Sequence, residues 1–153
     1  MSRISLNIPT EPGPRAWWQI YLGVGLTTLA TLVLELSLTR LFSVVFYYHF
    51  AFLAISIALF GLGAGGVLSY LVAARRGTAY EKLGWLAAGN SLAVLVSLVF
   101  ILSRSGEFSN LTLAAVYFAS ALPFMLAGAI VSLAISETIS RVDRVYFFDL
   151  LGA

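Results

Sequence analysis

The sequence predicts an all-α fold, a polytopic membrane helix bundle with four transmembrane helices and the truncated start of a fifth. Two observations indicate this class: 60% of the 153 residues are hydrophobic and only 10% are charged, and the mean hydropathy is +0.95. A soluble domain carries about 25% charged residues. A chain this poor in polar groups cannot cover its surface against water, so we expect the lipid bilayer to be its solvent.

The sequence divides into a short tail and one membrane domain. Residues 1–16 contain three of the four prolines, so we expect an irregular N-terminal tail. A helix needs about 20 apolar residues to cross about 30 Å of hydrocarbon, and such a run after Arg15 predicts a retained anchor rather than a cleaved signal peptide. The predicted domain, 17–153, has spans at about 17–38, 50–73, 83–102 and 111–135 and a short segment at 145–153. This segment begins like a fifth span and stops after about two turns, which predicts a fragment of a longer protein.

The basic residues indicate how the chain is oriented. Seven of the nine Lys and Arg residues fall on the side of the N-terminal tail, and only Arg40 and Arg104 fall on the other. Basic residues accumulate on the cytoplasmic side, so we predict an integral protein of a bacterial cytoplasmic membrane with a cytoplasmic N-terminus. The basic residues lie at the ends of the predicted spans, where lipid headgroups and membrane topology account for the net charge of +2. We therefore expect no nucleic-acid partner. With no cysteine, the chain has no thiolate for a metal site.

The first predicted span carries a polar stripe. Thr28, Thr31 and Glu35 lie three and four residues apart, so they share one helical face that should be turned toward protein. Two interpretations of Glu35 remain open: a structural acid near the outer interface that pairs with Arg40 or water, or an intramembrane acid that handles a ligand or a proton. His49 has no second His or Cys and no carboxylate near it at the spacing of metal ligands. We therefore expect His49 to form hydrogen bonds at the membrane interface. We predict no metal site and no cofactor.

Glycines dominate the second predicted span. Gly61, Gly63 and Gly66 match the G-x-G-x-x-G dinucleotide fingerprint, but they lie in one uncharged apolar run instead of between a strand and a helix. Gly61 and Gly65 lie four residues apart and predict close packing against another helix; the alternative is a broken helix that lines a polar site. Pro123 is expected to kink the fourth span and to free a carbonyl near its middle.

Asp149 is the second acid within a predicted apolar segment. Glu35 should lie about 27 Å along the first span from Trp17, whereas Asp149 should lie only about one turn past Val145 on the cytoplasmic side. We therefore expect the two carboxyl groups at opposite ends of the bilayer. Asp149 would then be neutralised by Arg144, by a headgroup or by a further part of the protein.

Five blocks of the sequence resemble a known family. They are Glu35-Leu-Ser-Leu-Thr-Arg40, Tyr48-His49-Phe-Ala-Phe52, Gly61-Leu-Gly-Ala-Gly-Gly66, Leu122-Pro-Phe-Met-Leu-Ala-Gly128 and Phe148-Asp-Leu-Leu-Gly-Ala153. In this order they resemble the membrane region of bacterial spermidine synthase-like proteins, relatives of the polyamine aminopropyltransferases with a multi-span N-terminal domain fused to a soluble Rossmann-like domain. The resemblance implies a membrane part of a larger protein. The family's nucleotide-binding and catalytic motifs have no counterpart in this chain, so no catalytic residue is assigned.

Two functions remain open from the sequence. The first is a non-catalytic membrane module that anchors, or supplies with ligand, a soluble aminopropyltransferase-like domain. The second is a transport module for a small solute such as a polyamine or another cation, with Glu35 as counter-ion and the glycine-rich helix as gate. Four spans are few for a transport pathway, so the second function would require a homo-oligomer or further helices. In both, the partner is the lipid bilayer and this chain alone is not expected to be an enzyme.

Overall fold

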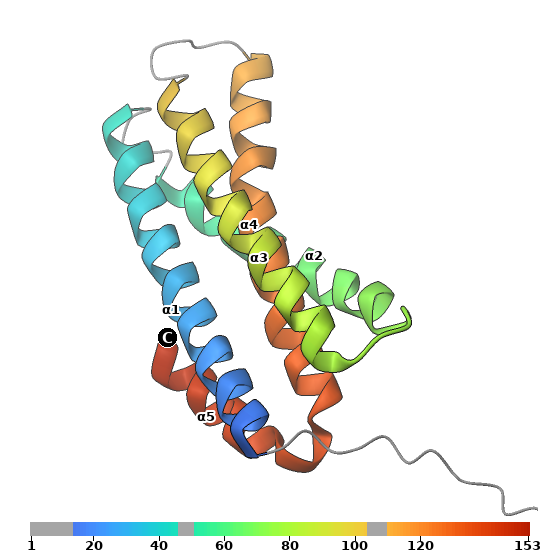
Figure 1. The fold of residues 1–153 in the computed structure, drawn as a ribbon. Coiled ribbons are helices and arrows are strands. Elements are labelled where there is room, and N and C mark those ends of the chain that lie inside the picture. The colour runs from blue at the N-terminus through green and yellow to red at the C-terminus, as the bar shows by residue number, and fades with distance from the viewer. Residues whose placement is uncertain (1–13, 46–50, 104–109) are drawn as a thin grey trace, which may run out of the picture.

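The computed structural model describes residues 14–45, 51–103 and 110–153, and within them the chain is helical with short connections (Figure 1). In chain order the elements are α1 (Pro14–Val45), α2 (Ala51–Ala73), α3 (Ala79–Ser103), α4 (Asn110–Glu137), the 3-10 helix η2 (Ile139–Arg141) and α5 (Val142–Gly152). Four helices are long and apolar enough to cross a membrane, over Trp17–Val44, Phe52–Ala73, Ala79–Ser103 and Leu111–Glu137. The predicted class, an all-α bundle of membrane helices, is confirmed.

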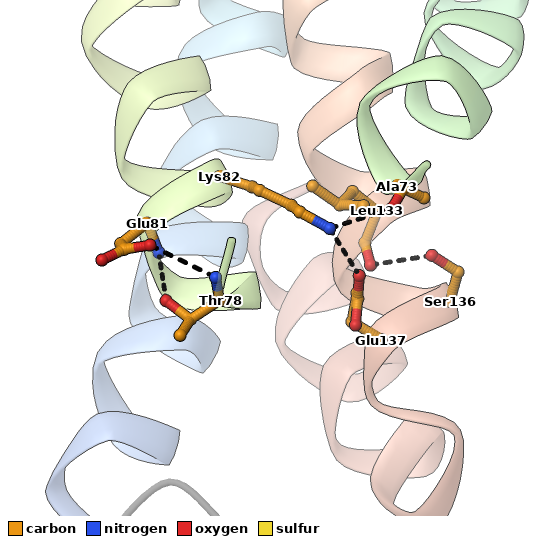
Figure 2. Close-up of polar contacts among 7 residues, drawn as sticks. All are labelled: Ala73, Thr78, Glu81, Lys82, Leu133, Ser136 and Glu137. Carbon is orange, nitrogen blue, oxygen red and sulfur yellow. Dashed lines mark hydrogen bonds and ion pairs between the residues drawn. The ribbon is translucent and has the colours of Figure 1, made fainter. Parts of the chain in front are cut away.

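α1 and α3 begin three and four residues before their predicted spans, each for a local reason. α1 begins at Pro14, a residue whose fixed φ suits the first helical position and whose missing N–H costs nothing there. α3 begins at Ala79 because Thr78 and Glu81 form a capping box (Figure 2): the Thr78 N–H donates to Glu81 Oε2 at 3.2 Å, and the Glu81 N–H donates to Thr78 Oγ1 at 3.3 Å. Capping residues therefore set these boundaries, outside the apolar runs.

α4 lies at the centre of the bundle and contacts each of the other four α-helices. α1, α3 and α4 run along the length of the molecule, α2 crosses behind α3 and α4, and α5 folds back beside the first half of α1 (Figure 1). The largest side chains of the core are almost wholly buried: Leu38, Phe42, Ile57, Phe124 and Leu133. α4 continues as one helix through Pro123, which is itself buried in this core.

The closest helix contact joins α2 to α4 through glycines. A Cβ added at Gly61 would lie 2.8 Å from the carbonyl oxygen of Ala121, and one at Gly65 would overlap the carbonyl oxygen of Met125. From the other side, a Cβ at Gly128 would lie 2.6 Å from the carbonyl oxygen of Leu62. Only glycine permits backbones to approach this closely, which is the packing that the spacing of Gly61 and Gly65 predicts.

The remaining two glycines of the predicted motif behave differently. Around Gly63 and Gly66, an added Cβ would meet nothing within 4 Å. α2 is helical without interruption through all four glycines, so the structure shows neither the helix break nor the strand-turn-helix of a dinucleotide fingerprint. Gly63 and Gly66 are therefore free of the packing role that Gly61 and Gly65 have.

Lys82 ties the ends of three helices together (Figure 2). Its Nζ donates a hydrogen bond to the carbonyl oxygen of Ala73 at 2.9 Å, and lies 3.6 Å from Oε1 of Glu137. Ala73 ends α2, Lys82 lies in the first turns of α3 and Glu137 ends α4. A cation at the C-terminal end of a helix is favourable because the last carbonyl groups have no partner in the helix.

Candidate functional site: a cavity between four helices

A large cavity lies between α1, α2, α4 and α5, and we call it the carboxylate cavity. Its volume is about 610 Å³, which falls in the range of about 300–1,000 Å³ typical of small-molecule sites. Thirteen residues line it: Thr28, Thr31, Leu32, Glu35, Leu62, Gly66, Ala127, Gly128, Val131, Ser132, Ile135, Ser136 and Asp149. Two of them, Glu35 and Asp149, carry a carboxyl group.

The polar stripe of α1 forms one wall of this cavity. Thr28, Thr31 and Glu35 are partly buried and all line it, as expected for residues on one helical face. The Thr31 hydroxyl donates to the carbonyl oxygen of Thr27 at 2.7 Å. Within the described residues Glu35 has no ion pair. Its carboxyl group is therefore available to the cavity.

The structure corrects the expected position of Asp149. Asp149 lies beside Thr28, whose hydroxyl donates a hydrogen bond to Asp149 Oδ1, and it lines the same cavity as Glu35. Thr28 and Glu35 are seven residues apart on α1, which corresponds to about 10 Å along the helix axis. The two acids thus share one cavity instead of lying at opposite ends of the bilayer, and Thr28 is the partner of Asp149.

The reason is the way in which α5 packs against α1. A Cβ at Gly25 would lie 2.9 Å from the carbonyl oxygen of Phe148, and one at Gly152 would overlap the carbonyl oxygen of Gly25. The ring of Phe148 stacks on that of Tyr21, with 5.6 Å between the centroids. At the start of α5, the guanidinium of Arg141 lies 5.1 Å from the centroid of Trp17. These contacts hold α5 along α1 and carry Asp149 up to the level of Thr28.

Serines of α4 and a glycine of α2 form the opposite wall, and the sequence reasoning missed the serines. Ser132 lies 2.8 Å from the hydroxyl of Ser69, and Ser69 donates to the carbonyl oxygen of Gly66 at 2.6 Å. The Ser136 hydroxyl donates to the carbonyl oxygen of Leu133 at 3.0 Å (Figure 2). A sequence signal existed, because Gly128 and Ser132 repeat on α4 the four-residue spacing of small residues recognised on α2.

The other candidate residues contribute less to this site. Arg40 is exposed and does not line the carboxylate cavity, and the described residues hold no ion pair between Arg40 and Glu35. Pro123 lines a separate cavity of only about 10 Å³ together with Thr31 and Asn90. The side-chain oxygen of Asn90 is buried there without a hydrogen-bond partner. His49 lies outside the described residues.

The chemistry of the carboxylate cavity favours a cationic occupant. Among the described residues that line it, two are acidic and none is basic. Carboxylates accept hydrogen bonds and have no hydrogen to donate when ionised, so the group that complements them is a cationic donor. The described residues contain no group of three or more His, Cys, Asp and Glu side chains that could hold a metal ion. The cavity thus presents two carboxylate acceptors to a cationic hydrogen-bond donor.

The chain matches no known protein family, no curated protein and no solved structure. The carboxylate cavity and the residues of the sequence are therefore the indications of its function.

Proposed function

We propose that this chain is a membrane module that binds a small organic cation in the carboxylate cavity. The observation that carries the proposal is the meeting of Glu35 and Asp149 in one cavity that no basic side chain of the described residues lines. Ionisable side chains are costly within apolar spans and are retained there mainly where they serve a ligand, an ion or a proton. An ammonium group beside either carboxylate would neutralise the charge of that group.

The resemblance to the membrane region of bacterial spermidine synthase-like proteins supports a role for such a module. We propose that the chain itself is non-catalytic and anchors a soluble aminopropyltransferase-like domain, or supplies it with an amine. The host membrane would be a bacterial cytoplasmic membrane, with the N-terminus of the chain on the cytoplasmic side. The excess of Lys and Arg on that side of the spans supports this orientation.

Transport of a small cation is the second candidate. The observation that favours it is the extent of the cavity, which reaches from Ser136, next to the end of α4, to Glu35 inside the α1 span. A solute bound near Asp149 could be passed to the deeper carboxylate by displacement. Because four spans are few for a complete pathway, this function would require a homo-oligomer or additional helices.

Ligand-induced stabilisation tests the proposed binding. The purified chain in lipid nanodiscs would be heated with 1,4-diaminobutane, spermidine or n-octylamine, and its Tm would be compared with that of Glu35→Gln and Asp149→Asn. A ligand that binds only the folded state raises the Tm. We expect at least one amine to raise the Tm of the native chain and to lose this effect in both variants. Asp143→Asn is the matched control, because Asp143 is an exposed acid of the same helix that does not line the cavity.

Absence of stabilisation by every amine, or the same stabilisation in Glu35→Gln and Asp149→Asn, would refute the proposed binding. Uptake of labelled spermidine into vesicles that contain the chain separates the two roles. Uptake that depends on Glu35 favours transport, whereas binding without uptake favours anchoring or supply of ligand.

A further inference from the structure

The geometry of the carboxylate cavity points to the kind of cation it takes, an inference that rests on the proposed binding function. We propose that the ligand is an amphiphilic amine: a primary or secondary ammonium group that pairs with a carboxylate, on a hydrocarbon body that fills the apolar remainder of the cavity. Such a ligand would reach the cavity through the hydrocarbon of the bilayer.

The apolar part of the lining is the first reason. Between the two acids the wall is built from aliphatic side chains and glycine: Leu32, Leu62, Gly66, Ala127, Val131 and Ile135. A volume of about 610 Å³ is far more than one ammonium group requires. Filling such space with hydrocarbon is favourable, at about 25 cal/mol per Å² of apolar surface removed from water.

The hydroxyl groups of the cavity are the second reason, because each already has a protein partner. Thr28 donates to Asp149, Thr31 donates to Thr27, Ser136 donates to Leu133 and Ser132 bonds to Ser69. Each hydroxyl hydrogen is thus committed, and oxygen lone pairs remain on these walls as acceptors for a ligand. Among the described residues, the lining therefore offers acceptors and no free hydroxyl donor, which suits an ammonium group, with the two carboxyl groups as its charged acceptors.

The absence of aromatic rings from the lining indicates which ammonium is bound. None of the described residues that line the cavity is Phe, Tyr or Trp. Quaternary ammonium groups have no N–H and are usually held by aromatic faces through cation–π contacts. A carboxylate instead binds best to a cation that donates hydrogen bonds. This favours primary and secondary amines over trimethylammonium compounds.

Access from the bilayer follows from the position of Leu32. This residue lines the cavity and is 36% exposed on the surface of the bundle. It lies about 22 Å along α1 from Trp17, at a depth where a spanning helix is surrounded by acyl chains. One edge of the cavity thus borders hydrocarbon, which an alkylamine can cross more easily than a hydrophilic polyamine.

Competition binding in nanodiscs tests this inference. Tritiated n-octylamine is the probe, and binding to empty nanodiscs is subtracted. We expect unlabelled n-octylamine to displace it at concentrations at least tenfold lower than those needed for octyltrimethylammonium, 1-octanol or 1,4-diaminobutane. These three competitors lack, in turn, the N–H donors, the charge and the long apolar body.

Two glycine variants provide a matched pair that does not touch the acids. An added Cβ meets nothing within 4 Å at either Gly63 or Gly66, but only Gly66 lines the cavity. We expect Gly66→Leu to weaken n-octylamine binding at least tenfold, and Gly63→Leu to leave it within twofold of the native value. Both substitutions lie on the same helix, so a general effect on folding would appear in both.

Three results would overturn the inference, and they differ in what they imply for the proposed function. Displacement by 1,4-diaminobutane at the same or lower concentrations would show a site for hydrophilic diamines, and the organic-cation function would stand. Equal displacement by octyltrimethylammonium would show that the site does not require N–H donors on the ligand. The proposed binding of an organic cation would still stand. If binding is unchanged in Gly66→Leu and in Glu35→Gln, the cavity is not the site and the proposed function fails with the inference.

Discussion

At the scale of single residues, the hydrogen bond between Thr28 and Asp149 decides where the second acid lies. It joins residues 121 positions apart in the sequence and fixes the carboxyl group of α5 against α1. Hydrogen bonds between membrane helices contribute about 0.6–1.7 kcal/mol. This modest free energy is nevertheless important locally, because α5 is only 11 residues long and makes few other polar contacts in the described structure.

Thr28→Val tests this bond, since valine keeps the shape of threonine and removes the hydroxyl. We expect a loss of about 0.6–1.7 kcal/mol in the stability of α5 docking, seen as faster hydrogen exchange of the α5 amides. Thr27→Val is the control, because the Thr27 hydroxyl donates within its own helix to the carbonyl oxygen of Gly23. Equal exchange in the two variants would mean that Asp149 is held by packing alone.

At the scale of helices, the contact between α2 and α4 depends on the missing side chain of Gly65. An added methyl group there would overlap the backbone of α4 at Met125 and Ala129. Backbone atoms cannot move aside as a flexible side chain can, so the helices would have to separate. We therefore expect a single added methyl group at position 65 to weaken the packing of α2 against α4.

We predict that Gly65→Ala lowers the free energy of unfolding by about 1–3 kcal/mol, the usual cost of overpacking. Gly63→Ala should be neutral or stabilising by up to about 1 kcal/mol, because alanine favours the helix and meets no neighbour at this position. The free energy of unfolding of each variant can be measured by unfolding the purified chain in mixed micelles with increasing fractions of SDS. If the two variants lose the same stability, the close approach of α2 and α4 is not needed by the fold.

The contacts of Lys82 with Ala73 and Glu137 also join helices. We expect Lys82→Met to lower the free energy of unfolding by about 1–2 kcal/mol, less than for a fully buried pair because the side chain of Glu137 is 32% exposed and partly screened by solvent. The exposed cation Arg76 provides the control, and Arg76→Met should have little effect. In a double-mutant cycle with Glu137→Gln, a coupling energy near zero would assign the effect of Lys82 to its bond with Ala73 alone.

Comparison of α1 with α5 shows how far sequence reasoning reaches in this molecule. The polar face of α1 was predictable, because the spacing of Thr28, Thr31 and Glu35 is a local property of one helix. The return of α5 was not, because it depends on the close approach of Gly25 and Gly152, which no periodicity reports. Composition thus predicted the membrane bundle, and residue spacing predicted the α1 wall of the candidate site, whereas the contribution of Asp149 depended on the tertiary fold.

At the scale of the whole molecule, the orientation of the bundle in the membrane decides which end of the carboxylate cavity lies nearer the cytoplasm. The loop between α2 and α3 contains Arg75 and Arg76, both exposed. By the distribution of basic residues, this loop and the N-terminus should lie in the cytoplasm. The end of the carboxylate cavity near Ser136 would then lie toward the cytoplasmic side, since α4 ends at the side of the bundle where Lys82 contacts Glu137.

Cysteine labelling can test this orientation cleanly, because the chain contains no cysteine of its own. We predict that a membrane-impermeant maleimide labels Ser103→Cys, at the end of α3, in intact bacterial cells. Arg76→Cys should be labelled only after the membrane is opened, because we expect this loop to face the cytoplasm. Leu95→Cys should escape the reagent in both preparations, since this exposed residue lies within an apolar span and is surrounded by acyl chains. Labelling of Arg76→Cys in intact cells would invert the orientation, and rapid labelling of Leu95→Cys would show that water, not lipid, surrounds α3.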